Sequence, residues 1–390
     1  MSYAYTASGV SLAEGDSFSA FAGRICKESF LNSPFVVVTD LARDHFRGPR
    51  GFQFVNLPKG CYIDVAPDGI GTKVVLIDAA GNRRTAANNL LAMTEGDITR
   101  WGGLPLLLVN LLDVKTLGKS PNDSKATPTD IAINNHYREM ISGMGEACRE
   151  QGIVCYRGET AELGHCVSSE NTQGLTQFNW GGMALGVYNP STLINGETLK
   201  PGQLIMALRD PSPRSNGYSL LRKGLGETFG DRWYTNPKAK EIITAAAEPA
   251  ALYGKLLSTA NGWFEKNFKP LVKIHLIVHL TGGSFHSKFA EDILFPLGLS
   301  AVLDNLWPPP AVVQECAEWM DVPDDECYKI FSAGQGVLVV IDKEDEESFN
   351  LLATSLGIES QRCGKITTGK TPNLTILSKF RGEKIVWCKQ

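Results

Sequence analysis

A carboxylate, two glycines, a hydroxyl and an ammonium group lie within six residues of this chain. The segment runs Asp68-Gly69-Ile70-Gly71-Thr72-Lys73. Glycines let backbone N–H groups approach phosphate oxygens, an aspartate can hold Mg²⁺, and a lysine can neutralise a phosphate. The segment is not a P-loop, and its G-x-G does not extend to the G-x-G-x-x-G of a dinucleotide site. It predicts either a phosphate-binding loop or a hairpin-like turn with a surface lysine.

A second polar segment, Arg157–Glu162 (RGETAE), follows a run at 153–156 that we predict to be a strand. Its two carboxylates, Glu159 and Glu162, lie three residues apart beside a glycine and could hold a metal ion or act as a base. The alternative is an exposed junction between a strand and a turn.

A third segment, Ser215–Arg222 (SNGYSLLR), opens a predicted helix at 216–227. Ser215 or Asn216 can cap this helix, and a helix N-terminus is a natural anion site. Simple capping is the alternative to an anion site.

The fourth segment, His279–Phe285 (HLTGGSF), ends an apolar strand and opens the helical pattern that follows it. A strand, a glycine-rich turn and a helix start are the arrangement that binds phosphate on backbone amides. His279 could donate a hydrogen bond to phosphate or move a proton, although a lone histidine at a strand end is often structural.

Composition excludes several classes of protein. The formal charge of −4 and pI near 5.9 give no global field for holding a polyanion, so we expect no nucleic-acid partner. The nine cysteines form no C-x-x-C pair, which argues against a zinc ribbon and favours a reducing compartment. The first residues lack the features of a signal peptide, and the apolar run 104–112 is too short to span a bilayer. We therefore expect a cytoplasmic protein with no membrane partner.

Alternating strand and helix patterns position the four segments and predict an α/β or α+β protein. In the first half, strands are expected at 35–38, 62–65, 73–77 and 104–112, and residues 119–129 should form a loop. A helix should follow, with Thr127 as N-cap, Pro128 at N1, Asp130 at N3 and Gly152 at its end. Its apolar stripe, expected to face the core, comprises Ile133, Tyr137, Met140, Ile141, Met144 and Cys148.

The best domain boundary lies at 189–202, which is rich in turn residues and lacks an apolar period. It predicts an N-terminal domain over 1–190 and a C-terminal domain over 200–390. The second half should contain helices or helical regions at 216–227, 239–261 and 311–320, and strands at 203–208, 271–279 and 336–342. The charge run 343–348 is expected to be a solvated helix start.

Taken together in this order and spacing, the four segments resemble phosphoribosylformylglycinamidine cyclo-ligase, also called aminoimidazole ribonucleotide (AIR) synthetase. The family motifs D-G-V-G-T-K, G-G-E-T-A-E, S-N-G-Y-S-L-V-R and H-L-T-G-G-G-F correspond to 68–73, 157–162, 215–222 and 279–285. Weaker matches extend the resemblance over nearly the whole chain, at Tyr5, Gly9, Val10, Met93, Asp97, Phe331, Gly334 and Gly336.

The resemblance implies a two-domain fold, in which the N-terminal sheets of two subunits pair into a shared barrel and the C-terminal domain stacks a sheet against helices. It implies a homodimer that uses ATP and Mg²⁺ to convert formylglycinamidine ribonucleotide into AIR, ADP and phosphate. The N-terminal domain would bind ATP and Mg²⁺ and form the dimer, and the C-terminal domain would bind phosphate and substrate.

The resemblance also implies roles for individual residues. Lys73, Glu159 and His279 would be catalytic, and Asp68, Asp97 and Glu159 would hold Mg²⁺. The residues expected to bind nucleotide or phosphate are Asp68, Gly69, Gly71, Thr72, Lys73, Ser215, Asn216, Gly282, Gly283 and Ser284.

Departures from the family pattern cluster in the motifs. Arg157 and Arg214 place guanidinium groups where the family has Gly and His, and Asn110 replaces an aspartate. RGPRGF (47–52) takes the place of a glycine-rich segment. The remaining exchanges are Thr6 for Lys, Gly96 for Asn, Leu163-Gly164-His165 for M-P-G, Ser284 for Gly and Ser332 for Asn.

Three functions are compatible with this pattern. The first is a divergent AIR synthetase. The second is a different ATP-dependent enzyme on the same architecture, since relatives act in selenophosphate, thiamine phosphate and hydrogenase-cofactor synthesis. The third is a non-catalytic member that binds a nucleotide or pairs with another subunit. The retained Asp68, Lys73, Asp97 and Glu159 support ATP handling more firmly than any one substrate.

Overall fold

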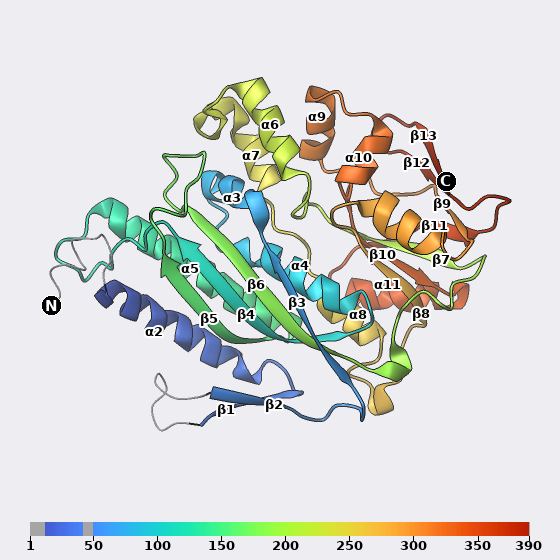
Figure 1. The fold of residues 1–390 in the computed structure, drawn as a ribbon, viewed down its shortest axis with the longest axis horizontal. Coiled ribbons are helices and arrows are strands. Elements are labelled where there is room, and N and C mark those ends of the chain that lie inside the picture. Colours follow the sequence, from blue (N-terminus) through green and yellow to red (C-terminus); the bar gives the residue numbers. More distant parts are fainter. Residues whose placement is uncertain (1–11, 42–49, 390) are drawn as a thin grey trace. The chain divides into compact units, whose positions relative to one another are not determined.

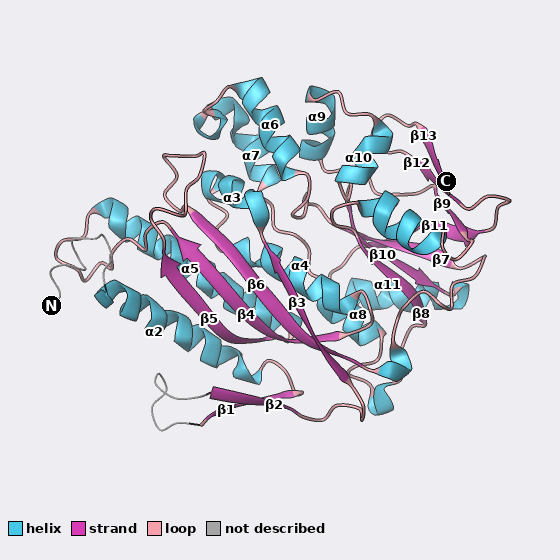
Figure 2. Cartoon of the chain, in the orientation of Figure 1, coloured by secondary structure: helices cyan, strands magenta, loops and turns pink. Residues whose placement is uncertain are grey.

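The computed structural model describes residues 12–41 and 50–389, which form two compact units. The first unit contains the residues up to Thr94 together with Pro105–Val187, and the second contains Glu95–Leu104 and everything from Tyr188 onward. The segment Glu95–Leu104 therefore belongs to the second unit, although the sequence division assigned it to the first half. Helices and strands are mixed in both units (Figure 2), which confirms the α/β class. Tyr5, Thr6, Gly9, Val10 and residues 47–49 lie outside the described residues.

The first unit is built on an open four-stranded sheet with the order β3-β6-β4-β5. A separate antiparallel pair, β1 (Val36–Asp40) and β2 (Arg50–Phe54), precedes it. The strands of the sheet are β3 (Tyr62–Gly69), β4 (Leu104–Val114), β5 (Val154–Glu162) and β6 (Phe178–Tyr188). The strands expected at 35–38, 62–65 and 104–112 are confirmed. Because β3 and β5 are open edges of this sheet among the described residues, the shared barrel stays a prediction.

Two long helices, α2 (Leu12–Glu28) and α5 (Pro128–Gln151), lie side by side next to β5 (Figure 1). The predicted start of α5 is confirmed. Thr127 accepts from the Asp130 amide while Asp130 accepts from the Thr127 amide, and Gly152 ends the helix in the left-handed conformation. All six residues of the predicted apolar stripe are buried. Local capping and periodicity were therefore sufficient to place this helix.

The strand expected at 73–77 is wrong. Gly71–Lys73 form one turn of 3₁₀ helix, α3 (Val74–Ala80) follows, and Gly81 ends it in the left-handed conformation. A short apolar run fits a buried strand and a buried helix equally well, because periodicity does not separate the two over five residues. α4 (Ala86–Thr99) then leads into β4.

The second unit is built on a seven-stranded sheet with the order β13-β12-β9-β11-β7-β10-β8. Its strands are β7 (Leu204–Arg209), β8 (Ile274–His279), β9 (Ser300–Leu303), β10 (Gln335–Ile341), β11 (Ser360–Thr367), β12 (Asn373–Leu377) and β13 (Lys384–Cys388). The strands predicted at 203–208, 271–279 and 336–342 are confirmed. β7, β8 and β10 share a buried apolar cluster with α8 (Gly254–Ala260) and α11 (Glu346–Ser355).

The remaining helices of this unit are α6 (Tyr218–Phe229), α7 (Lys240–Ala246), α9 (Ala311–Trp319) and α10 (Asp324–Ile330). The helical region expected at 239–261 is split into α7 and α8, because Pro249 lies between them and has no backbone N–H for a helical hydrogen bond. The charge run at 343–348 opens α11, as predicted.

Candidate functional site

Two of the four motif segments and the weaker match at 331–336 meet within the second unit, at the ends of β7 and β8 and the start of β10. The Leu280 amide donates to Gly336 O at 3.2 Å, which joins the end of β8 to the start of β10. The Ser284 hydroxyl donates to Phe331 O at 3.1 Å. At Gly217, with φ of 73°, an added Cβ would lie 2.1 Å from the Phe331 ring, so only glycine permits this approach. The structure thus brings together 214–217, 279–285 and 331–336.

The expected side-chain caps of α6 are wrong. Gly217 is the N-cap of α6, and no side chain caps the helix. The Ser215 Oγ and Asn216 Nδ2 atoms are instead buried, and within the described part of the chain they have no hydrogen-bond partner; the same holds for Ser332 Oγ. A buried polar atom left without a partner costs about 1–3 kcal/mol. Polar atoms of this kind suit a site in which a polar ligand supplies the missing hydrogen bonds.

The glycine-rich turn after β8 is confirmed, and it leads into a π-helical segment, η7 (Phe285–Leu294). Gly283 has φ of 80° and Ser284 has φ of 37°, a conformation that disfavours side chains. The serine is held there by its bond to Phe331. The Ser284 amide already donates to Thr281 O at 2.8 Å, so it is engaged within the turn. A Cβ at Gly282 would meet open space.

His279 lies at the end of β8 and is 2 % exposed. Its Nε2 is 3.0 Å from Arg214 Nη2, and its Nδ1 is 3.6 Å from Asp97 Oδ1. Burial lowers the pKa of His279 to about 4, against an opposing effect of Asp97. Burial alone would raise the pKa of Asp97, but its contacts with His279, Lys288 and Arg100 outweigh burial and lower it. The pair is therefore a neutral imidazole beside a carboxylate.

Arg214, a departure from the family pattern, is buried inside the second unit. Its Nη1 donates to Asp210 Oδ2 at 2.7 Å, and its guanidinium carbon lies 5.4 Å from the centre of the Tyr253 ring. Asp210 is itself fully buried and also accepts from Ser212 and Ala251. Arg214 therefore fills an internal position rather than facing solvent.

In the first unit, the segment 68–73 joins β3 to α3. Asp68 is exposed, and its Oδ1 accepts from the Gly69 amide at 2.7 Å. Thr72 is exposed as well. Lys73 is fully buried and donates to Asn89 Oδ1 at 2.7 Å. The alternative of a hairpin-like turn with a surface lysine is wrong, because the chain turns from a strand into a helix and encloses the ammonium group.

The segment 157–162 lies within β5 rather than after it, which corrects the predicted junction between a strand and a turn. Its Gly158 faces Asn110 of β4, and a Cβ at Gly158 would lie 2.5 Å from Asn110 Nδ2. Asn110 is buried, accepts from Trp180 Nε1 at 3.2 Å and contacts Arg157 O at 3.4 Å. In this chain, Asn110 has the role of a hydrogen-bonded core residue.

The sheet order keeps two of the predicted metal ligands apart. Asp68 is on edge strand β3 and Glu159 is on the opposite edge strand, β5, with β6 and β4 between them. Three strand spacings amount to about 14 Å, too far for one ion to contact both carboxylates of the same chain. Asp97 belongs to the other unit. Across residues 12–41 and 50–389, no group of three or more His, Cys, Asp or Glu side chains forms a metal cluster.

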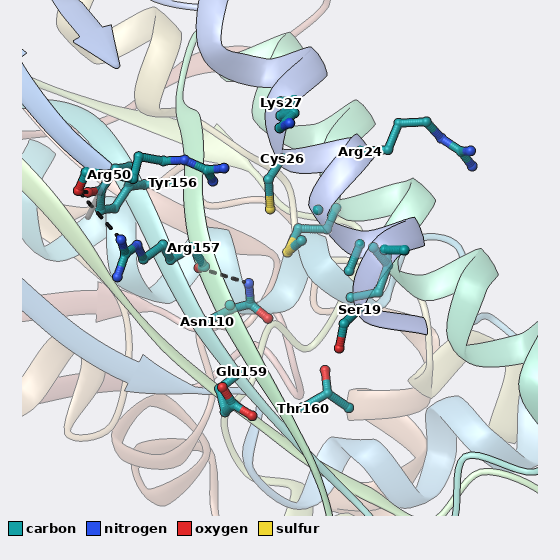
Figure 3. A pocket seen from close by; sticks show the side chains of 16 residues that line it. Ser19, Arg24, Cys26, Lys27, Arg50, Asn110, Tyr156, Arg157, Glu159 and Thr160 are labelled. Carbon is teal, nitrogen blue, oxygen red and sulfur yellow. Dashed lines mark hydrogen bonds between the residues drawn. The ribbon is translucent and has the colours of Figure 1, made fainter. Parts of the chain in front are cut away.

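A pocket of about 580 Å³ lies beside β5 (Figure 3). Side chains of α2 line one side of it and those of β5 line another. Its charged lining residues are Arg24, Lys27, Arg50, Arg157 and Glu159. Arg50 is paired with Asp40, whereas Arg157 is exposed and stacks on Tyr156. The sequence analysis missed Arg24, Lys27 and Arg50 because no spacing signal links them to a segment more than a hundred residues away.

The comparisons with known proteins agree with this architecture. The model of AIR synthase related proteins, N-terminal domain, matches residues 53–185, and that of the C-terminal domain matches residues 200–376. The chain belongs to the AIR synthase related family. It has no helix, within the described residues, that is long and apolar enough to cross a membrane.

Two curated relatives share the name of one specific enzyme. Phosphoribosylformylglycinamidine cyclo-ligase of Staphylococcus carnosus (strain TM300) is 27 % identical over 301 residues, covering 77 % of this chain and 78 % of that protein. The protein of the same name from Anaeromyxobacter sp. (strain Fw109-5) is 28 % identical over 306 residues, covering 77 % and 79 %.

Solved structures share the fold at low identity. Hydrogenase maturation protein HypE in complex with ATP superposes with a TM-score of 0.55 at 12 % identity and covers 94 % of both chains. Thiamine-monophosphate kinase from Stenotrophomonas maltophilia K279a gives 0.54 at 12 % identity, covering 92 % of this chain and 95 % of that one.

Proposed function

We propose that this protein is an ATP-dependent cyclo-ligase that converts formylglycinamidine ribonucleotide into aminoimidazole ribonucleotide, ADP and phosphate. The observation that carries the proposal is the meeting of the segments 214–217, 279–285 and 331–336. They carry Ser215, Asn216 and Ser332, each with a buried polar atom that has no hydrogen-bond partner among the described residues. The similarity to two curated cyclo-ligases over 77 % of the chain supports it.

The proposed reaction needs ATP because a formamide oxygen is a poor leaving group until it is phosphorylated. The protein would then contribute positioning and charge neutralisation. Gly282 and Gly283 would offer backbone amides to phosphate, and Ser215 and Asn216 would offer their side chains. Gly69, Gly71 and Thr72 would line the nucleotide site of the first unit. The Ser284 amide, being engaged with Thr281, leaves its backbone role to its neighbours.

Mg²⁺ uses only one or two protein carboxylates when substrate phosphates and water complete its shell. Asp68 in the first unit and Asp97 in the second could each supply such a carboxylate within its own unit, since neither is buried in the core of that unit. When bound, the ion would neutralise phosphate charge. Glu159, on the opposite edge of the sheet from Asp68, would not share this ion with Asp68 of the same chain. Lys73 would neutralise phosphate charge from its buried position, where it donates to Asn89.

A different acceptor substrate is the second candidate. The exposed guanidinium of Arg157, where the family has glycine, lies in a pocket with four positively charged lining residues and one negatively charged one. A pocket of this kind favours an anionic ligand. An ATP-dependent enzyme of the same family that acts on another, anionic substrate would explain this positively charged pocket. A non-catalytic nucleotide-binding member is the remaining alternative.

The test is a product assay with Mg²⁺, ATP and formylglycinamidine ribonucleotide, in which aminoimidazole ribonucleotide and ADP are measured together. Equal amounts of both products are expected, with a loss of at least about 100-fold in Asp68→Ala, the effect of removing a preorganised charge contact. Asp64→Ala removes an exposed carboxylate from the same strand and is the matched control. ATP binding without aminoimidazole ribonucleotide would reject the cyclo-ligase, and ADP release with other acceptors would then select the second candidate.

We further propose a homodimer formed through the first unit. Edge strand β3 exposes Tyr62, Ile63 and Val65, and β4 exposes Leu111. An exposed edge strand with apolar side chains promotes aggregation, and pairing with a second copy of the chain would cover it. A cytoplasmic location fits the cysteines, all nine of which are free thiols.

A further inference from the structure

Two departures from the family pattern, Gly96 and Arg214, contact the same side chain from different elements of the second unit. Arg214 Nη2 lies 3.0 Å from His279 Nε2. At Gly96 of α4, an added Cβ would lie 2.3 Å from His279 Cε1 and 2.6 Å from both ring nitrogens. The imidazole therefore rests directly on the backbone of α4, in space that the asparagine of the family pattern would occupy.

The contact with Arg214 determines which ring nitrogen carries the proton. A guanidinium group has only donors, and it stays protonated in proteins. His279 Nε2 must therefore accept this hydrogen bond with its lone pair, which leaves the proton of a neutral imidazole on Nδ1. Asp97 Oδ1 lies 3.6 Å from Nδ1. This distance exceeds a hydrogen bond, so the carboxylate has to move by several tenths of an ångström to accept the proton.

Arg214 is itself held rigidly enough to impose this choice. Its 2.7 Å bond to the buried Asp210 and its position over the Tyr253 ring leave the guanidinium little freedom. The other charged groups near the imidazole are Arg100, which follows α4, and Lys288 of η7; both line a small cavity with His279 and also act on Asp97. Neither can accept a proton from Nδ1, which leaves Asp97 as the acceptor among the charged groups around the ring.

We propose that Arg214 and Gly96 act together as positioning residues that hold His279 as the Nδ1–H tautomer, directed at Asp97. His279 is then a residue that orients the Asp97 carboxylate, rather than one that donates from Nε2 to a transferred phosphoryl group. Outer contacts of this kind orient a ligating carboxylate and are costly to lose. The importance of Asp97 rests on the function proposed above, whereas the tautomer does not.

The test is ¹⁵N NMR of protein labelled at its histidines, of which the chain has only six. The signal that disappears in His279→Gln identifies the residue. At neutral pH, the unmodified protein should show His279 with a protonated Nδ1 and an unprotonated Nε2. A protonated Nε2 would overturn the proposal, whatever the enzyme assay shows. His275, a second buried histidine of the same unit, is the internal control, because its Nδ1 contacts Thr198 and not Arg214.

Substitutions separate positioning from a purely structural role. Arg214→Lys keeps a donor and should keep the Nδ1–H tautomer, whereas Arg214→Met should release Nε2 and give a mixture of tautomers. Gly96→Asn should displace the ring and change the His279 signals while leaving those of His275 in place. If Arg214→Met folds and its His279 spectrum equals that of the unmodified protein, Arg214 does not select the tautomer. If Arg214→Met does not fold, the spectra of the unmodified protein and of Arg214→Lys decide.

The binding of Mg²⁺–ATP tests the proposed function separately from the tautomer. Mg²⁺–ATP affinity, measured by calorimetric titration, should fall about tenfold in Arg214→Met and be retained in Arg214→Lys. A confirmed tautomer with no binding of Mg²⁺–ATP in the unmodified protein would reject the proposed function and leave the positioning arrangement intact.

Discussion

At the scale of single residues, Gly96 gives the most direct prediction. Replacing a helical glycine by alanine normally gains about 0.5–1 kcal/mol. Gly96→Ala should instead destabilise the protein by about 1–3 kcal/mol, because its Cβ would overlap the His279 ring. The measurement is the midpoint of urea unfolding. Gly23→Ala in α2, where the same Cβ meets nothing within 4 Å, is the matched control and should be neutral or stabilising. Equal effects of both changes would contradict the packing of His279 on α4.

His279 also makes stability depend on pH. Burial lowers its pKa in the folded state to about 4, from 6.5 in a model compound. Below pH 6.5 the unfolded chain therefore binds a proton that the folded chain does not, so the free energy of unfolding falls as the pH falls from about 6.5 towards 4. The full contribution is at most about 3 kcal/mol.

Urea unfolding at pH 7 and pH 5 measures this effect. Compared with the unmodified protein, His279→Gln should lose less stability between the two pH values, because glutamine does not titrate. An unchanged difference between the two pH values would show that other groups carry the dependence.

At the scale of elements, the start of α5 depends on one capping box. Thr127→Ala removes the acceptor of the Asp130 amide and should cost about 1 kcal/mol, with a lower urea midpoint. Thr244→Ala in α7 is the control, since that exposed hydroxyl donates to the carbonyl of Lys240 in its own helix. An equal loss of stability in Thr244→Ala would show that the capping hydrogen bond contributes no more than an ordinary helical threonine hydroxyl.

The element that sequence reasoning placed wrongly follows directly after the segment 68–73 of the first unit. Residues 74–80 form a helix, and this choice buries Lys73 instead of exposing it. A short run of Val, Leu and Ile satisfies either conformation locally. What decides between them is the neighbourhood, here the bond between Lys73 and Asn89, sixteen residues further along the chain.

At the scale of the whole molecule, the proposed dimer gives a prediction about mass. Ile63→Lys places a charge on edge strand β3, at a side chain that is 62 % exposed, and should shift the protein from dimer to monomer. Light scattering after size-exclusion chromatography measures the mass. Leu351→Lys, at a 65 % exposed leucine in α11 of the second unit, is the control and should stay dimeric. A dimer that survives Ile63→Lys would place the interface elsewhere.

The sequence by itself determined the features that depend on local chemistry. It placed α5 and its cap, because capping residues and a 3.6-residue period act within a few turns. It also placed the strands β1, β3, β4, β7, β8 and β10, and it led to the family through four short motifs. Each of these features depends on residues that lie close together in the sequence, so no distant contact is needed to recognise it.

Only the tertiary structure decided what the departures from those motifs do. It buried Arg214 against Asp210 and His279, and it exposed Arg157 in a pocket beside β5. It separated Asp68 from Glu159 by two strands, and it left the buried Ser215 Oγ and Asn216 Nδ2 atoms without a hydrogen-bond partner among the described residues. Apart from the bond between Arg214 and Asp210, these outcomes relate residues tens of positions apart or more, such as Arg214 and His279. The partners of a charged or polar group are set by which strands and helices pack together, and a motif of six residues carries no information about that packing.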